Sequence, residues 1–237
     1  MNIKTRGIVI KRIPYSDNKL ILHLFTKDCG RISSIVQVGK SMRSKYKRHL
    51  SNPLQLLDVD LVRKNDSGFY QIREFKHAYI FKSISSDVRR ASIAMYLIEF
   101  FNKTTQGIDV NVPYFKFCWT AIQSLDQNAK VENLHLYIIT KALRYMGLQP
   151  SLLSKEKEYF DIVNAGFVKN VTQNCLNELN SNILRCILSS DSFEALSLSL
   201  KREQRSAYIE GIERYWAYHF EGFKPSKSLK VLELLWD

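Results

Sequence analysis

A run of basic residues without acidic neighbours is the first feature of this sequence that could do chemistry. The stretch VGKSMRSKYKRHLSNP, residues 38–53, lies in an interval between Asp28 and Asp58 that contains no other acidic residue. The basic residues of this interval are Arg31, Lys40, Arg43, Lys45, Lys47 and Arg48. Lysine and arginine neutralise phosphate groups, so this run favours a polyanionic partner over a merely solvated loop.

The first third of the chain holds nearly all of its positive charge. Residues 1–80 contain sixteen Lys and Arg against six Asp and Glu, a net charge of +10, out of +12 for the whole chain. Such an imbalance favours nucleic acid or an anionic membrane surface. A membrane surface would call for an amphipathic helix, and this third of the chain does not predict one, so nucleic acid is the favoured partner.

Aromatic residues accompany the basic ones. Proteins that bind single strands combine a positive groove with aromatic faces on which bases stack, and Tyr15, Tyr46, Phe69 and Tyr70 lie near predicted turns. We therefore predict a nucleic-acid-binding surface. Its residues are Lys11, Arg12, Arg31, Lys40, Arg43, Lys45, Tyr46, Lys47 and Arg48.

Residue patterns of the common enzyme classes are missing. The sequence has no Gly-rich phosphate loop, HExxH or GxSxG, and its five histidines occur singly. Asp58 and Asp60, two apart on one predicted strand, have a spacing that a metal site could use, although a solvated strand face is the favoured interpretation. The four cysteines form no CxxC pair and are expected to be reduced thiols. We predict no enzymatic activity, metal or cofactor.

No apolar run approaches the roughly 18 residues that a membrane span requires. The opening MNIKTRGIVIKRI interleaves charges where a signal peptide needs an unbroken apolar stretch. These features predict a cytoplasmic protein, associated with the nucleoid if DNA is its partner, and without membrane contact.

The basic residues must be positioned by the elements around them. Segments rich in Ile, Val, Leu, Phe and Tyr predict five strands, at residues 7–13, 19–26, 31–38, 54–63 and 69–81. Turn residues separate them, and the basic stretch joins the third strand to the fourth. Five short antiparallel strands favour an oligonucleotide-binding barrel, with an SH3-like barrel left open as an alternative.

Beyond residue 82 the apolar period becomes that of helices. Helices are predicted from Ser86 or Asp87 to 102, over 131–146 with Gly147 and Pro150 as a stop, over 203–220, and from Ser226 or Ser228 onward. We predict an α+β multidomain protein, with a five-stranded antiparallel barrel in residues 1–81 and an all-α domain in 82–237. The polar residues near 148–170 are expected to form an irregular insertion.

Several segments, in order along the whole chain, resemble the RecO family of bacterial recombination mediators. They are GIVIKRIPYSDNKLILHLFTKDCGRIS, the basic stretch with Asn52-Pro53-Leu54, SISSDVRRASIAMYLIEFF, and the C-terminal LKREQRSAYIEGIERYWAYHFEGFKPSKSLKVLELLW. The resemblance implies an oligonucleotide-binding barrel followed by a helical domain. It also implies DNA repair: binding of single- and double-stranded DNA, annealing of complementary strands without ATP, and, with RecR, loading of RecA onto DNA coated by the single-stranded-DNA-binding protein.

The resemblance has one departure, and it suggests a second surface. Many family members carry a four-cysteine zinc module after the helix corresponding to 131–146, but residues 148–170 contain neither Cys nor His, so we predict that zinc is absent. The helical domain is expected to receive the acidic, apolar C-terminal tail of the single-stranded-DNA-binding protein. The candidate residues for this docking are Lys141, Arg144, Lys201, Arg202 and Arg205.

Three alternative functions stay open at this point. Charge does not distinguish RNA from DNA, so an RNA-binding barrel protein fits the same pattern. A non-catalytic docking adaptor would rely chiefly on the helical domain. A nuclease would need clustered carboxylates and a divalent metal, for which only Asp58 and Asp60 offer any spacing.

Overall fold

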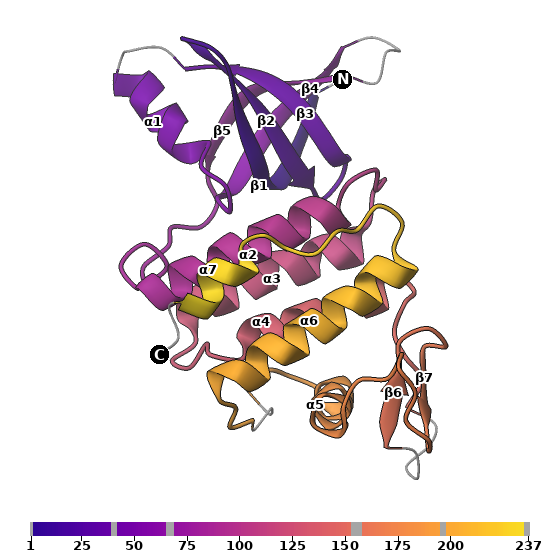
Figure 1. The fold of residues 1–237 in the computed structure, drawn as a ribbon. Helices are drawn as coiled ribbons and strands as arrows, with labels where there is room; N and C mark the ends of the chain where they lie inside the picture. The colour runs from indigo at the N-terminus through magenta and orange to yellow at the C-terminus, as the bar shows by residue number, and fades with distance from the viewer. Residues whose placement is uncertain (1, 39–41, 65–68, 153–157, 195–197, 235–237) are drawn as a thin grey trace. The chain divides into compact units, whose positions relative to one another are not determined.

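The computed structural model describes residues 2–38, 42–64, 69–152, 158–194 and 198–234. The chain forms two compact units, which are Met1–Asp87 with Leu97–Gln127, and Val88–Tyr96 with Asn128–Asp237. Helix α2 (Val88–Thr104) therefore begins in the second unit and ends in the first (Figure 1). The expected domain boundary after residue 81 stays a prediction.

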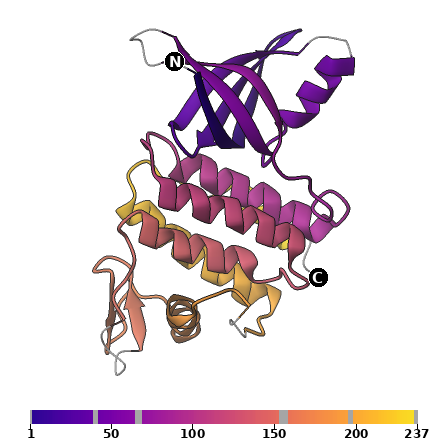
Figure 2. The ribbon, with the colours of Figure 1, turned by 180° about the vertical axis from the view of Figure 1, so that it is seen from behind.

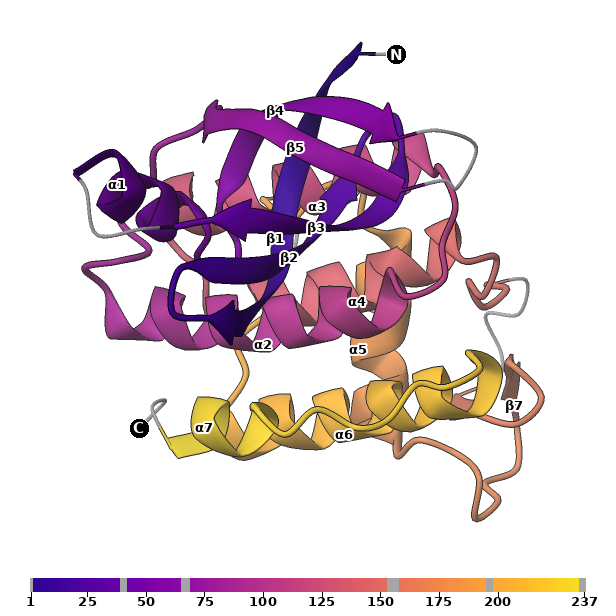
Figure 3. The same cartoon turned by 90° about the horizontal axis from the view of Figure 1, so that it is seen from above.

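The first unit contains a curled, fully antiparallel sheet of five strands (Figures 1 and 3). The strands are β1 (Asn2–Ser16), β2 (Lys19–Thr26), β3 (Gly30–Gln37), β4 (Leu56–Lys64) and β5 (Phe69–His77). Their order across the sheet is β3-β2-β1-β4-β5. This arrangement confirms the predicted fold class, because the curled sheet is consistent with an oligonucleotide-binding barrel followed by a helical region.

Alternation along the strands explains why the sheet curls around a core. Leu20, Leu22 and Leu24 of β2 are buried inside, whereas Ile21 and His23 between them are only partly buried. A strand with this period buries one face and leaves the other toward solvent. The apolar interior is therefore lined by every second residue, and the residues between them form the outer face.

The sheet approaches closure between its two outermost strands. The Ser34 hydroxyl of β3 accepts a hydrogen bond from the Ile72 N–H of β5 at 3.1 Å. Both residues are buried, so the Ile72 N–H needs a hydrogen-bond acceptor within the protein. The Ser34 hydroxyl acts as this acceptor, the role that a backbone carbonyl plays between regularly paired strands.

Strand β1 is shared by the two halves of the sheet. Its first residues, 2–8, pair with β4, and residues 7–16 pair with β2. The register of the second pairing shifts between Val9 and Lys11, as at a β-bulge. The first half of β1 therefore contributes exposed residues to the outer face beside β4, and its second half contributes them to the outer face beside β2.

Helix α3 (Val112–Gln127) packs against the strands through aromatic side chains. Phe25 at the end of β2 lies 5.8 Å from Tyr114 and 5.6 Å from Phe115, between ring centroids. Gly30 at the following turn has φ of +64°, and a Cβ there would meet the Asp109 backbone at 2.8 Å. Only glycine fits this approach.

The segment after β5 is fixed by one carboxylate of α3. Asp126 accepts backbone N–H bonds from Lys82, Ser83 and Ile84 at 2.8 to 3.1 Å, and the Tyr79 hydroxyl donates to it at 3.0 Å. Burial alone would raise the pKa of Asp126, but these backbone hydrogen bonds lower it below its ordinary value. The connection from sheet to helices is thus held by charge-assisted hydrogen bonds.

The second unit is mainly helical. Its helices, besides the start of α2, are α4 (Leu134–Tyr145), α5 (Glu178–Ser189), α6 (Arg202–His219) and α7 (Leu229–Leu234). Helices α4 and α6 run side by side and α5 crosses their direction (Figure 2). The Trp216 indole N–H of α6 donates to the Ile139 carbonyl of α4 at 3.1 Å, and α4 ends just before Gly147, as predicted.

A buried glutamate ties three segments of this unit together. Glu213 of α6 is 1% exposed. It accepts the Tyr96 hydroxyl at 3.0 Å and the Ser226 N–H at 2.8 Å. The chain entering α7 is therefore held to α6 and, through Tyr96, to the middle of α2.

A short hairpin occupies part of the stretch in which an irregular insertion was expected. Strands β6 (Tyr159–Asp161) and β7 (Gly166–Val168) are antiparallel. The Asp161 carboxylate accepts the N–H groups of Val163 and Asn164 at 2.8 and 3.0 Å, which closes the turn. Phe160 packs on Phe167, with ring centroids 5.3 Å apart, so aromatic contacts support the hairpin.

Two whole-chain expectations can be compared with the described residues. No helix in this part of the chain combines the length and apolar character needed to cross a membrane. All four cysteines are free thiols, of which Cys118 is buried and Cys186 is exposed.

Candidate nucleic-acid interface

The basic stretch forms a helix, α1 (Met42–Leu50), where the sequence predicted a non-helical connection. That expectation was wrong because the helix is stabilised by tertiary contacts rather than by an apolar period of its own. Leu50 at its end and Val38 before it are both 0% exposed and belong to the barrel core. The basic residues Lys47 and Arg48 lie in the last turn, where cations interact favourably with the helix dipole.

Helix α1 rests on the end of β5 through ring contacts. Tyr46 and His49 place their rings 6.0 and 5.9 Å from His77. Burial lowers the pKa of His77, and the neighbouring His49 lowers it further. These contacts orient the helix, so its side chains have a defined relation to the sheet.

The predicted residues of the basic stretch fall into two groups. Arg48 is exposed, Lys47 is half-buried and Tyr46 is 48% exposed, so a ligand could reach an aromatic ring beside two cations. Lys40 lies outside the described residues. Arg43 and Lys45 belong to α1, and their side chains are outside the described part of the structure.

Arg12 and Lys11 are the two predicted binding residues of β1. Arg12 lies near α1, and Lys11 lies on the adjoining face of the sheet. The Arg12 guanidinium donates to the Asn52 side-chain oxygen at 2.7 Å, and Asn52 lies two residues after the end of α1. Lys11 is exposed and pairs across the sheet with His23 of β2. Burial, with the charges of Arg31 and Lys11, lowers the pKa of His23, as expected where positive charge gathers.

Arg31 has internal partners. Its guanidinium donates to the Asn102 carbonyl at 2.7 Å, to the Asn102 side-chain oxygen at 2.8 Å and to the Thr105 hydroxyl at 3.0 Å. The side chain is half-buried, and burial lowers its pKa. These bonds attach β3 to the end of α2, which gives Arg31 a structural role.

The outer face of β1, β2 and β3 carries an apolar row that sequence reasoning missed. Ile13 pairs with Ile21, and Ile21 pairs with Ile35, which is 53% exposed. Tyr15, 61% exposed, lies two residues further along β1. Only the strand register brings the three isoleucines together, so no local signal could have found them.

The predicted docking cations of the helical region differ in how they are used. Lys141 donates to the Leu188 and Ser190 carbonyls at 3.1 and 2.6 Å, at the end of α5, and burial lowers its pKa. Arg205 donates to the Leu200 carbonyl at 2.7 Å. Arg144 and Lys201 are exposed, and Arg202 is half-buried.

Asp58 and Asp60, the two carboxylates whose spacing a metal site could use, lie beside basic residues. Asp58 lies 4.0 Å from the Arg6 guanidinium, and Asp60 pairs across the strands with Lys4. Within the described residues, no three His, Cys, Asp or Glu side chains are grouped so that they could hold a metal ion. The nuclease alternative gains no support from this arrangement.

A curled, five-stranded antiparallel sheet bearing a basic helix, followed by a helical region, is consistent with the oligonucleotide-binding fold. The family model described as Recombination protein O N terminal matches residues 1–81, and the one described as Recombination protein O C terminal matches residues 85–229. The chain therefore belongs to the RecO family of DNA repair proteins.

Similar curated proteins span the same length. The DNA repair protein RecO of Flavobacterium psychrophilum is 29% identical over 234 residues, which are 98% of each chain. That of Phocaeicola vulgatus is 29% identical over 244 residues, covering 99% of each chain. That of Azobacteroides pseudotrichonymphae is 26% identical over 241 residues, with both chains covered completely.

Proposed function

We propose that this chain is a non-catalytic mediator of DNA repair that binds single- and double-stranded DNA and anneals complementary strands without ATP. With RecR, it would help to load RecA onto DNA coated by the single-stranded-DNA-binding protein, in the cytoplasm beside the nucleoid. The observation that carries the proposal is the helix α1, whose described residues contain basic side chains and no acidic ones, on a barrel of the oligonucleotide-binding class.

The sign of the charges on the two outer faces of the sheet favours one DNA path. Lys11 and Arg12 lie on the side of the β1–β2 pairing, and Arg12 is hydrogen-bonded to Asn52, two residues after the end of α1. Asp58, Asp60 and Glu74 lie on the β4–β5 side, opposite Lys4, Arg6 and Lys76, so charges of both signs offset one another there. DNA is expected to follow α1 and the β1–β2–β3 face, with bases against Tyr15, Tyr46 and the isoleucine row.

Annealing would follow from charge neutralisation. Two single strands repel each other through their phosphates, and cations on the protein replace the counterions that each strand carries. Contacts to phosphates leave the base edges accessible, so complementary bases on two bound strands can pair. No step requires ATP or a reacting group on the protein.

The test compares two variants with the same change of net charge. In the first, Lys40, Arg43, Lys45, Lys47 and Arg48 are changed to Glu. In the second, five exposed cations of the helical region are changed to Glu, namely Lys130, Lys169, Arg214, Lys224 and Lys230. Annealing of complementary oligonucleotides coated with the single-stranded-DNA-binding protein is measured without ATP.

Fast annealing by the wild type and the second variant, and none by a folded first variant, is the expected result. The first variant should also bind an uncoated single strand with a weaker salt dependence. Its slope of log affinity against log salt should be smaller by about 0.7 for each phosphate that it no longer neutralises. Equal loss of annealing in both variants would mean that general charge, and not α1, is responsible. Stronger binding to an RNA strand of the same sequence would favour the RNA-binding alternative.

A docking role for the helical region is the second candidate. The two exposed cations among the predicted residues, Arg144 and Lys201, could contact the acidic tail of the single-stranded-DNA-binding protein, whereas Lys141 and Arg205 already bind backbone carbonyls. Changing Arg144 and Lys201 to Glu should weaken binding of a synthetic tail peptide at least tenfold without changing affinity for DNA. Unchanged peptide binding would exclude these two residues from the docking site.

A further inference from the structure

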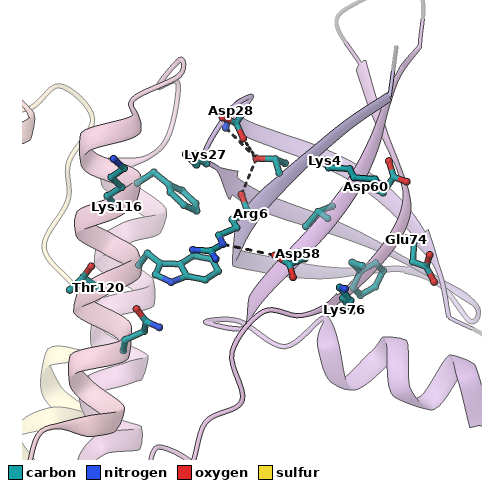
Figure 4. Close-up of a pocket in the computed structure, with 16 residues that line it drawn as sticks. Lys4, Arg6, Lys27, Asp28, Asp58, Asp60, Glu74, Lys76, Lys116 and Thr120 are labelled. Carbon is teal, nitrogen blue, oxygen red and sulfur yellow. Dashed lines mark hydrogen bonds and ion pairs between the residues drawn. The ribbon is translucent and has the colours of Figure 1, made fainter.

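The strands β1, β2 and β3 contain basic residues but no Asp or Glu. The groove that α3 forms with β1, β4 and β5 is different, because Asp58 and Asp60 lie there beside Arg6 and Lys4 (Figure 4). Charges of both signs offset one another in that groove, so it does not favour an anion. The second half of β1, with β2 and β3, presents cations alone and does favour one.

One row of side chains across this face combines three groups that can bind a phosphate. His23 of β2 pairs with Lys11 of β1 on one side and with Ser33 of β3 on the other. Lys11 and Ser33 are exposed, and His23 is half-buried. Directly opposed residues of neighbouring strands lie about 5 Å apart, so an ammonium, an imidazole and a hydroxyl group can contact the same anion.

Ser33 orients the His23 ring in either protonation state. Its hydroxyl oxygen lies 2.7 Å from the His23 Nδ1 atom. A hydroxyl group can donate to an unprotonated Nδ1 or accept from a protonated one. When it donates, the neutral ring carries its proton on Nε2, and the charged ring carries protons on both nitrogens. The Nε2 N–H is therefore a donor for a ligand in both states.

Helices cover one side of this row and leave the other side open. Two residues further along β2, Phe25 pairs with Arg31 and is covered by aromatic rings of α3. Two residues in the opposite direction, Ile21 pairs with Ile35, which is exposed. A ligand that reaches His23 therefore also contacts the isoleucine row.

The charged groups beside His23 are cations. Burial lowers the pKa of His23, and so do the charges of Arg31 on β3 and Lys11 on β1. A phosphate placed there would meet this positive charge and would favour the protonated form of the imidazole ring. Binding of the phosphate and uptake of a proton from solvent thus strengthen each other, because the coupling between two ligands is reciprocal.

We propose that Lys11, His23 and Ser33 form a phosphate subsite for a DNA strand, in which His23 takes up a proton as the strand binds. The base of the same nucleotide lies on the isoleucine row, which is about 7 Å away because two residues of a strand separate the rows. Tyr15, further along β1, offers a ring to a neighbouring base. This inference rests on the DNA-binding function proposed above and adds His23 and Ser33 to its contact residues.

The test follows the histidine ring signals of the full-length protein by NMR as the pH is changed, with and without an oligothymidylate strand. Thymine has no group that titrates near neutral pH, so a change in affinity reports on the protein. Affinity is measured over the same pH range at constant ionic strength, since salt alone changes it. The variants are His23→Gln and Ser33→Ala, and the control is His219→Gln in the second unit.

The wild type should bind the strand about threefold or more tightly at pH 5.5 than at pH 7.5, because one proton is taken up on binding. The pKa of His23 should be higher in the complex than in the free protein. His23→Gln should lose at least half of the gain in affinity, Ser33→Ala should reduce it, and His219→Gln should keep it. The methyl signals of Ile21 and Ile35 should shift in the same titration.

An unchanged His23 pKa in a complex of normal affinity would overturn the subsite and leave the DNA-binding function intact. Failure of the wild type to bind the strand at any pH would instead refute that function. A hexaglutamate peptide provides the remaining comparison. If it raises the His23 pKa as much as the strand does, the row binds carboxylates of a protein, and the assignment to a nucleotide is wrong.

Discussion

The Ser34 hydroxyl of β3 accepts the Ile72 N–H of β5 at 3.1 Å, and this bond joins the two outermost strands of the sheet. Ser34 is 6% exposed and Ile72 is 9% exposed, so water has little access to the donor if the hydroxyl is removed. A residue that looks like an ordinary polar side chain in a strand thus contributes to barrel closure.

Ser34→Ala should lower the free energy of unfolding by about 1–3 kcal/mol, because it leaves a buried N–H without its acceptor. Urea titration followed by circular dichroism measures the change. The neighbouring Ser33→Ala is the control, since Ser33 is exposed and its bond to His23 is a surface contact, for which a change of about 0.5 kcal/mol or less is expected. Equal effects of the two variants would show that the Ser34 bond is not a closing contact.

The hydrogen bond between Arg12 and Asn52 allows charge and geometry to be separated. Arg12→Gln should reduce the slope of log affinity against log salt by about 0.7 on single-stranded DNA, because one phosphate is no longer neutralised. Asn52→Ala removes the 2.7 Å bond but leaves the guanidinium, so the slope should stay unchanged. A similar decrease of the slope in both variants would mean that the orientation of Arg12, rather than its charge, governs binding.

Asp126 is expected to control the stability of the first unit at acid pH. Its folded pKa is lowered, so the stability that it provides is present above its unfolded pKa and is lost as the pH falls. Asp126→Asn should cost at least about 2 kcal/mol at neutral pH, since several hydrogen bonds to a charged group are weakened together. The amides of Ser83 and Ile84 should exchange hydrogen faster.

The control for this prediction is Asp109→Asn at an exposed position of the same unit. It should leave both the unfolding curve and the amide exchange unchanged. An Asp126→Asn protein whose stability still falls toward acid pH as steeply as that of the wild type would contradict the assignment.

His135 should make the second unit sensitive to mild acid. The side chain is 1% exposed, and burial, with the nearby charge of Arg205, lowers its pKa to about 3. The unfolded chain takes up the proton near pH 6.5 while the folded chain does not, so stability falls by up to about 1.4 kcal/mol per pH unit below that value. His135→Phe should flatten this part of the curve, whereas the exposed His49→Gln should leave it in place.

The sequence predicted the five strands and the helices α2, α4, α6 and α7, because their apolar periods are strong and their turn residues are specific. It did not single out α3 or α5. Helix α1 was missed since its few apolar residues, such as Leu50, are stabilised by the barrel core and not by a periodic face. The internal role of Arg31 could not be foreseen, because its partner Asn102 is 71 residues away and carries no local signal.

Partners within the fold also explain why two of the predicted docking cations are already hydrogen-bonded. Lys141 and Arg205 have the charge expected of a partner-binding surface, but their hydrogen bonds go to carbonyl groups of this chain. Composition reports which side chains are present, whereas only the fold determines which of their donors are already used. The charged row Lys4, Asp60 and Glu74 on the outer face of β1, β4 and β5 was also beyond prediction, since only the strand register brings these residues side by side.

The sharing of β1 between two neighbours limits where this protein tolerates changes of length. An insertion of one residue between Ile3 and Gly7 would turn Lys4 or Arg6 toward the interior and shift the pairing with β4. The turn at Asp17 and Asn18 lies outside all of these pairings. A tag or fluorescent label inserted at that turn should leave the barrel intact, whereas the same insertion within residues 3–12 should prevent folding.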